Sequence, residues 1–265
     1  MGQRVWQEFS AQGAYDSKQY KKFPTKKDND FFACVNGVAT YAPNDPKYAF
    51  RCKNLDLYDF QTHAQLGSAS GRGAGSWGWA SPQGREFVAI AQIDGTAFVE
   101  VSKKGKLTYL GRLPQYTTAQ PSLWREIKGY KSYIVIGSEA EQHGVQIFDM
   151  RKLLTVKPGS PVVFTNEKDL TGWWGDGLPI GRSHNVLTNE ERNYGVATGF
   201  QPRNATLRAG LLFFDLTDPS NPKTLGGTGA DGYVHDAQCV VYRGPDRKYL
   251  GRDICYGYDE DALTM

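Results

Sequence analysis

Leu211-Leu212-Phe213-Phe214-Asp215-Leu216-Thr217 is an apolar, strand-like run that ends on a carboxylate and is followed by a turn. Two other segments end in the same way, Thr96–Ser102 with Glu100 and Val145–Met150 with Asp149. An all-β chain that repeats one unit about every 40–50 residues is typical of a β-propeller, because a single blade cannot bury its own hydrophobic face. The repeat therefore predicts an all-β fold, in which these acids cap turns rather than react.

The composition also indicates many short strands joined by tight turns. Of the 265 residues, 30 are Gly and 13 are Pro, and 13% are aromatic, whereas apolar patterns with the helical period are scarce. The net charge of +3, from 31 basic and 28 acidic residues, gives no electrostatic argument for a nucleic-acid partner or an anionic membrane. A run of about 18 apolar residues, as a membrane span would need, is also absent from the sequence.

The repeat divides the chain into a polar N-terminal arm, residues 1–30, and a partial propeller, residues 31–265. The predicted units lie at about residues 77–113, 124–164, 183–225 and 235–265. A flexible Gly/Ser loop is expected at Gly67–Ser76, and Pro161–Phe164 is the expected outer strand of the second unit. The fourth unit stops at Met265 inside its third strand. We therefore expect an incomplete β-propeller of about four four-stranded antiparallel blades, the last truncated, in a fragment of a longer chain.

The four cysteines form two pairs that are close in the sequence, Cys34 with Cys52 and Cys239 with Cys255. The second pair flanks two strand-like segments joined by a turn, and a hairpin would bring its thiols within bridging distance. Two disulfides and an oxidising compartment are therefore predicted. The alternative is an intracellular scaffold with four reduced cysteines. Asn204 begins an N-glycosylation sequon in a polar, loop-like stretch, which favours an extracellular protein.

Two of the four histidines, His184 and His235, stand where the first strands of the third and fourth units are expected to begin. The first strands of a propeller line its central channel, so polar side chains at these positions are expected to converge near the channel mouth. Imidazole and carboxylate groups suit a divalent metal ion or acid-base catalysis, and the alternative is a structural role in hydrogen bonds between blades. The candidate catalytic residues are His184, His235, Asp236, Arg125 and Glu126.

Aromatic residues are the candidates for ligand binding. Trp79 opens the first unit, and Trp173 and Trp174 lie on a long loop, where exposed rings would contact a sugar or a protein partner. The alternative for these rings is packing across the face of the propeller. Glu139 and His143 lie together on another loop, which we interpret as a turn, with a cation site as the alternative.

Several motifs resemble those of one protein family. They are Cys34–Ala39, Trp77–Trp79, Asp94–Val99, Trp124–Ile127, Ser138–Gln146 and Gly232–Tyr242. Together they resemble the choice-of-anchor B proteins, whose LVIVD-type repeats form propellers, and similar fungal proteins are described as regulatory P domain-containing. The resemblance covers about residues 31–265. It implies secretion or surface display, and it implies no reaction.

The resemblance and the residues together predict a secreted or cell-surface propeller that binds a protein or a glycan, and they leave enzymatic activity open. Family members usually begin with a signal peptide, which the residues Met1–Trp6 do not contain. The alternative function is a metal-assisted hydrolase or lyase, with its site at the channel mouth formed by His184, His235 and Asp236. A divalent metal ion belongs to this alternative alone, and no other cofactor is predicted.

Overall fold

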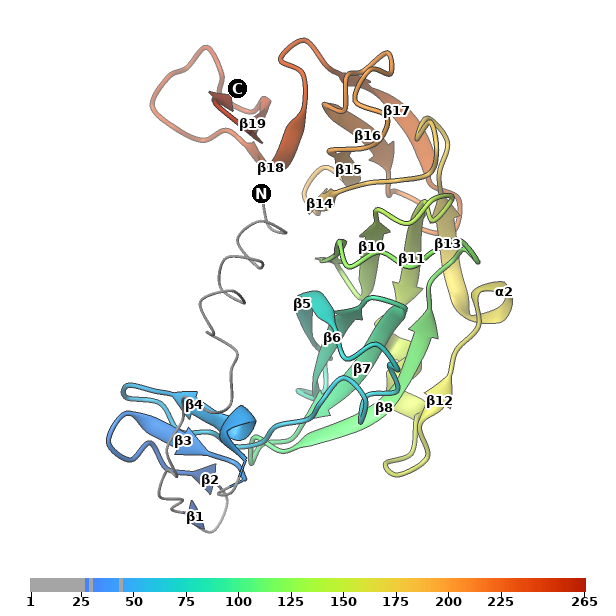
Figure 1. The fold of residues 1–265 in the computed structure, drawn as a ribbon. Helices are drawn as coiled ribbons and strands as arrows, with labels where there is room; N and C mark the ends of the chain where they lie inside the picture. Colours follow the sequence, from blue (N-terminus) through green and yellow to red (C-terminus); the bar gives the residue numbers. More distant parts are fainter. Residues whose placement is uncertain (1–26, 29–30, 43–44) are drawn as a thin grey trace. The chain divides into compact units, whose positions relative to one another are not determined.

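The structure is a computed structural model that describes residues 27–28, 31–42 and 45–265. The chain divides into two compact units (Figure 1). The first comprises residues 1–61 and 102–107, and the second comprises residues 62–101 and 108–265. Most of the predicted arm at residues 1–30 lies outside the described residues; its described part, Lys27–Asp28, is a short strand.

The first unit contains two short antiparallel ladders. β1 (Lys27–Asp28) pairs with β2 (Phe31–Phe32), and β3 (Val38–Thr40) pairs with β4 (Ala49–Arg51). The short 3-10 helix η2 (Pro46–Tyr48) precedes β4. Such small sheets bury little surface, and two features stabilise them. One is the Cys34–Cys52 disulfide, and the other is a group of neighbouring aromatic rings, which are Phe32, Tyr41, Tyr48, Phe50 and Phe60.

The described residues of the second unit form four sheets, and each sheet begins with strands that follow one another in the sequence. The first sheet contains β5 (Gly73–Ala80), β6 (Glu86–Gln92), β7 (Gly95–Val101) and β8 (Leu107–Pro114). The second contains β9 (Arg125–Tyr130), β10 (Tyr133–Ser138), β11 (Val145–Asp149) and β13 (Leu170–Trp174). The third contains β14 (Asn185–Asn189), β15 (Tyr194–Thr198), β16 (Leu211–Asp215) and β17 (Lys223–Thr228). The fourth contains β18 (Val234–Val241), β19 (Asp253–Asp259) and β20 (Leu263–Thr264).

The predicted outer strand of the second sheet is wrong. The residues Val162–Val163 form β12, which pairs parallel with β8 of the first sheet, and the outer strand of the second sheet is β13. Two short helical segments lie in the connection, η3 (Met150–Thr155) and α2 (Asn166–Asp169). The helical turn that follows β11 directs the chain away from its own sheet, and Val162–Val163 then add to the edge of the preceding one.

The predicted Gly67–Ser76 loop is also too long, because β5 begins at Gly73. Gly73 faces the His63 ring, and a Cβ atom at this position would lie 2.3 Å from His63 Cε1. A glycine inside a strand often marks such a close approach of a neighbouring group.

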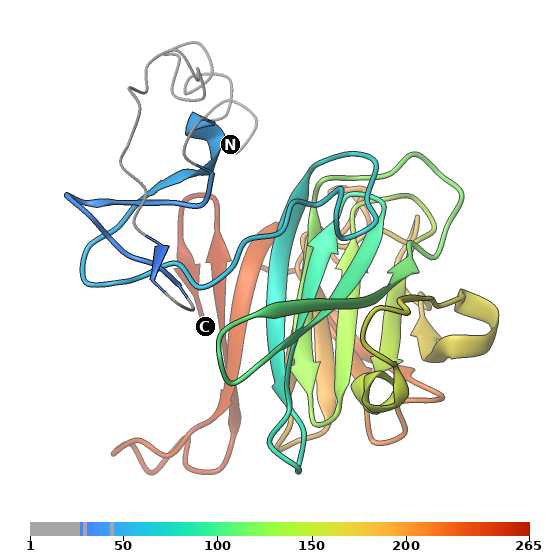
Figure 2. The same ribbon diagram turned by 90° about the horizontal axis from the view of Figure 1, so that it is seen from below.

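The first strands of the four sheets are neighbours in space. β5 lies against β9, β9 against β14, and β14 against β18. Figure 2 shows strands of successive sheets of the second unit running side by side. None of the sheets formed by the described residues closes on itself. The all-β fold is therefore confirmed, with strands in mainly antiparallel sheets.

A separate hydrophobic cluster fills each space between consecutive sheets. Phe98 of the first sheet stacks on Phe148 of the second with ring centroids 4.6 Å apart. Trp174 of the second sheet stacks on Phe214 of the third at 4.3 Å. Within β10, Ile134 packs toward the first cluster and Val135 toward the second. Successive side chains of a strand point to opposite faces, so a central strand here is buried on both faces and depends on both neighbouring sheets.

No helix among the described residues has the length and apolar character needed to cross a membrane.

Candidate functional site

Three chain segments meet where the first strands β9, β14 and β18 begin, and backbone hydrogen bonds hold them together. The Glu139 amide, which follows β10, donates to the carbonyl of Trp124 at 3.0 Å. The His184 amide, directly before β14, donates to the Thr198 carbonyl at 2.9 Å, and the Thr198 hydroxyl donates to the His235 carbonyl at 3.1 Å. Thr198 is fully buried, so one rigid residue positions the backbone of both histidines.

The side chains of Glu139, His184 and His235, here called the histidine cluster, form a continuous hydrogen-bonded chain. The His184 Nδ1 atom lies 2.5 Å from Glu139 Oε1, and the His184 Nε2 atom lies 2.9 Å from His235 Nε2. A carboxylate only accepts, so His184 donates through Nδ1–H, and in the neutral ring its Nε2 atom carries the lone pair toward His235. The two predicted histidines are therefore brought together, and the third member, Glu139, comes from the loop that we interpreted as a turn.

His235 reaches this position because β18 contains a bulge. In the pairing of β18 with β19, Val234 is opposite Asp259 and Asp236 is opposite Tyr258, so His235 has no partner residue in the ladder. A bulge adds one residue to a strand and changes the direction of its side chain, and bulges are common near functional sites. This local irregularity turns the His235 ring to His184.

The histidine cluster is accessible to solvent at one end. The His184 side chain is 14% exposed and that of Glu139 is 24% exposed, while His235 is an exposed residue. Partial burial, together with the neighbouring His184 ring, lowers the pKa of His235 below its usual value. His235 is consequently neutral at physiological pH, with a ring nitrogen free to act as an acceptor or ligand.

A row of three rings runs along this site, and we call Trp124, His184 and His235 the aromatic row. The Trp124 and His184 ring centroids are 5.9 Å apart, and those of His184 and His235 are 4.4 Å apart. Trp124 is 39% exposed. Arg182 also stabilises the site, because its Nε–H donates to the Glu139 backbone carbonyl at 2.5 Å.

Arg125, one of the candidate catalytic residues, is buried and pairs with His143. Only 2% of it is exposed, and its Nη1 atom lies 2.9 Å from His143 Nε2. The His143 Nδ1–H donates to the Gly144 carbonyl at 2.9 Å, so His143 Nε2 accepts from the guanidinium. Burial lowers the pKa of Arg125 to about 10, and burial with the Arg125 charge lowers the pKa of His143 to about 3. At physiological pH Arg125 is therefore charged and His143 is neutral, and both side chains lie inside the protein.

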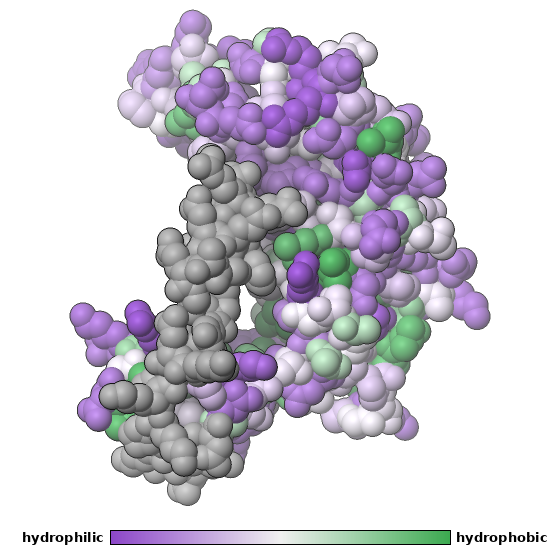
Figure 3. Space-filling view, in the orientation of Figure 1, coloured by the Kyte–Doolittle hydropathy of each residue, from purple (hydrophilic) through white to green (hydrophobic). Residues whose placement is uncertain are grey.

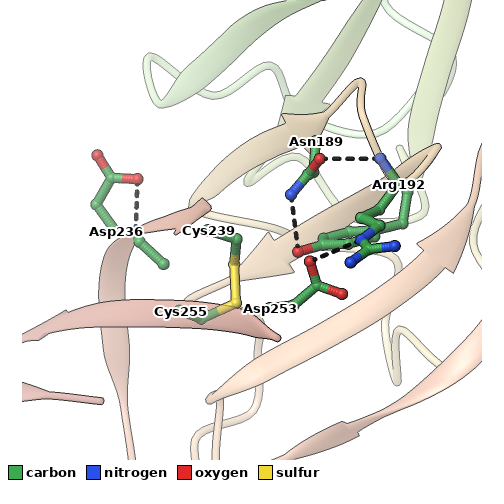
Figure 4. Close-up of a disulfide and its surroundings, with 8 residues drawn as sticks. Asn189, Arg192, Asp236, Cys239, Asp253 and Cys255 are labelled. Carbon is green, nitrogen blue, oxygen red and sulfur yellow. Dashed lines mark hydrogen bonds and ion pairs between the residues drawn. A yellow bond between two sulfur atoms is a disulfide. The ribbon is translucent and has the colours of Figure 1, made fainter. Parts of the chain in front are cut away.

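The remaining two catalytic candidates have other partners than the side chains of the histidine cluster. Glu126 forms an ion pair with Lys128 at 3.0 Å. The Asp236 carboxylate accepts from the amide of the following residue, Ala237, at 2.8 Å, and Figure 4 shows it turned back on its own backbone. Within residues 27–28, 31–42 and 45–265, no three His, Cys, Asp or Glu side chains are grouped so that they could hold a metal ion. The predicted three-ligand site with Asp236 is therefore not formed.

The three tryptophan candidates have different environments. Trp174 is 1% exposed and its indole N–H donates to Thr224, so it packs between sheets and offers no surface to a ligand. Trp79 is partly buried and stacks on Phe87. Trp173 is 38% exposed, and it stacks on Tyr116 with centroids 4.8 Å apart. Only Trp173 has the predicted exposed ring, and both Trp173 and Trp174 lie in β13 rather than on the predicted long loop.

Both predicted disulfides are confirmed. Cys34 is bonded to Cys52, and Cys239 to Cys255. Cys239 and Cys255 are directly opposite in the β18–β19 ladder, as Figure 4 shows. Asn204 is exposed in a turn between β15 and β16.

Sequence reasoning missed the partners of the site rather than its histidines. The sequence places Glu139 and His143 on one loop, but Glu139 faces His184 and His143 faces Arg125. Trp124 is not among the binding residues that the sequence predicts. Its place directly before β9, equivalent to that of His184 before β14, was the available signal.

Comparison of the sequence with protein-family models finds no match, and comparison with curated proteins finds no significant relative. The site therefore has to be interpreted from its own geometry. On the face seen in Figure 3, the described residues are largely hydrophilic, with separate hydrophobic patches among them.

Proposed function

We propose that this protein is an extracellular β-propeller of the choice-of-anchor B type that binds a protein or glycan ligand through the aromatic row. Binding needs exposed rings held in fixed positions with polar groups beside them. It requires no nucleophile or proton relay. The propeller, the family and the compartment are part of this proposal.

Three observations support the propeller. Four sheets follow one another along the chain, and their first strands are neighbours in the order β5, β9, β14, β18. A hydrophobic cluster lies between each pair of consecutive sheets. The third strands of the second and third sheets carry a register shift at the same place, after Ile147 and after Phe213, two residues before Asp149 and Asp215. A repeated irregularity is expected of repeated units.

An extracellular environment is supported by the two disulfides, because such bonds persist mainly in oxidising compartments. The exposed position of Asn204 in a turn makes its sequon accessible to glycosylation.

The observation that carries the proposed binding role is the aromatic row itself. Trp124, His184 and His235 come from the beginnings of three neighbouring first strands, and Thr198 fixes two of them. Rings held on rigid strands lose little conformational entropy when a ligand binds, and exposed Trp side chains dominate many interfaces. Glu139 and Arg182 lie beside the row and supply an acceptor and a donor for hydroxyl or amide groups.

The test uses a printed glycan array and a displayed peptide library as probes, with the full chain as the analyte. A probe that binds should lose at least about tenfold in affinity to Trp124→Ala, since removal of a central anchor costs at least about 1.4 kcal/mol. Tyr249→Ala is the matched control. Tyr249 lies on the β18–β19 connection, beyond the end of β18 remote from His235, and its variant should bind like the unaltered protein. Equal binding by Trp124→Ala would contradict the proposal.

A further inference from the structure

The histidine cluster has a geometry that a hydrogen-bonded histidine pair alone does not require. Two ring nitrogens, His184 Nε2 and His235 Nε2, face each other at 2.9 Å. The Nδ1–H of His184 is already donated to Glu139, so the neutral ring of His184 presents a lone pair at the contact. In the absence of any other group, His235 Nε2 has to donate a proton to it.

Glu139 occupies the place that a carboxylate takes beside a metal-binding histidine. Histidine ligands of metal ions almost always donate their other ring N–H to a carboxylate or carbonyl, which fixes the tautomer and the orientation of the ring and makes the ligand more basic. Here the Nδ1 to Oε1 distance is 2.5 Å. The Glu139 backbone is itself held by Trp124 and by Arg182.

The spacing of the two ring nitrogens is close to that of a metal site. Zinc–nitrogen bonds of about 2.0–2.1 Å at a tetrahedral angle place two ligand nitrogens about 3.4 Å apart. The observed 2.9 Å needs to open by only a few tenths of an ångström. Rotation of the exposed His235 side chain can supply this movement, while Thr198 still holds the His235 backbone.

One carboxylate belongs to the site, and the arginines around it are paired with other carboxylates. Glu139 contributes a carboxylate, and the cationic Arg182 directs its Nη1 atom to Glu141 at 4.0 Å. The other nearby guanidinium, that of Arg203, forms a two-point pair with Glu260, with both contacts at 3.1 Å. Neither arginine forms a hydrogen bond with an imidazole nitrogen of the cluster among the contacts of the described residues.

We infer that His184 and His235 bind a divalent transition-metal ion of the zinc or copper class, with Glu139 as the carboxylate that orients His184. Two protein ligands leave at least two coordination positions, which water or an oxygen or nitrogen donor of a ligand would occupy. Imidazole ligands select zinc and copper over calcium and magnesium. This inference stands independently of the proposed binding role, because the metal site is defined without a glycan or peptide.

The test is a calorimetric titration of ZnCl2 into the full, untagged chain after removal of metals by a chelator, with CaCl2 as the comparison. One equivalent of Zn2+ should bind, and no Ca2+. His184→Ala and His235→Ala should abolish uptake, and Glu139→Gln should weaken it about 10–100-fold. Asp236→Asn is the control beside the site, because the Asp236 carboxylate accepts from the Ala237 amide and is not a proposed ligand, and it should still bind one equivalent of Zn2+.

A second measurement separates loss of the site from loss of the fold. Zn2+ should raise the thermal unfolding midpoint of the unaltered chain and of Asp236→Asn, because a ligand that binds only the folded state stabilises it. It should leave the midpoint of His184→Ala and His235→Ala unchanged, while their circular dichroism spectra match that of the unaltered protein. Uptake of no zinc by the unaltered chain, or full uptake by both alanine variants, would overturn the inference.

Discussion

Each acid at the end of the repeated strands makes a local contact. Asp149 accepts from the Arg151 amide at 2.9 Å, and Asp215 accepts from the Thr217 amide at 2.7 Å. Both cap the turn that follows their strand, as predicted. Glu100 differs, because it pairs with Arg85 through two short contacts of 2.7 and 2.9 Å. The acids of the second and third sheets therefore cap turns, whereas Glu100 of the first sheet does not and pairs with an arginine of its own sheet edge.

His143 provides a prediction about pH at the residue scale. Its pKa is about 3 in the folded protein, against the ordinary value of 6.5, mainly because it is buried and secondly because it faces Arg125. Between these two values the unfolded chain binds a proton that the folded protein does not. Lowering the pH from 6.5 toward 3 should therefore reduce the free energy of unfolding, by up to about 1.4 kcal/mol per pH unit from this residue.

The measurement compares denaturant unfolding of the unaltered chain and His143→Gln at several pH values from 7 to 4. Glutamine can still accept from Arg125, and it does not titrate. The variant should lose less stability over this range, while the contributions of other groups, including His63 and His235, are common to both proteins. If the free energy of unfolding falls equally with pH in the two proteins, His143 does not cause the loss of stability.

At the element scale, Gly111 decides whether β12 can pair with the first sheet. It has a φ of +143°, and a Cβ atom there would lie 2.0 Å from the Val162 carbonyl oxygen. Gly111→Ala should displace β12 and lower the free energy of unfolding by about 2–3 kcal/mol, from backbone strain and from the clash. Amide hydrogen exchange at Val162 and Val163 should become faster.

Gly226→Ala is the matched control for this substitution. Gly226 also lies in a strand with positive φ, +113°, but a Cβ atom there would meet no atom within 4 Å. Gly226→Ala should lower the free energy of unfolding by about 1 kcal/mol, from backbone strain alone. Equal losses for the two variants would mean that the Val162 contact contributes nothing.

At the scale of the whole molecule, the two disulfides belong to different compact units. Cys34–Cys52 lies in the first unit and Cys239–Cys255 in the second. Replacing Cys239 and Cys255 by Ser should cost about 3 kcal/mol, the value for a closed loop of about 15 residues. Hydrogen exchange should accelerate in β18–β20 and stay unchanged in β1–β4.

The reciprocal variant, with Cys34 and Cys52 replaced by Ser, should accelerate exchange in β1–β4 and leave β18–β20 unchanged. Peptide mapping without reductant should show the two predicted cysteine pairs in the unaltered chain. If either double variant accelerates exchange in both groups of strands, the units do not unfold separately.

The all-β class, the positions of most strands and both cysteine pairs could be predicted from the sequence, because they depend on local patterns. Alternating apolar residues define a strand, and a turn between two strands brings Cys239 opposite Cys255. The convergence of His184 and His235 followed from the repeat, since equivalent positions of neighbouring units lie side by side.

Other features were decided only by the tertiary structure. The outer strand of the second sheet is β13 rather than Pro161–Phe164, because pairing depends on which edge is within reach and not on the residues that pair. Three contacts of this kind connect segments that are separated in the sequence. Trp174 packs on Phe214, Arg125 pairs with His143, and Glu139 contacts His184. The strand-and-acid repeat of Leu211–Thr217 thus determined where strands end, and only the packing of one sheet against the next determined which side chains meet.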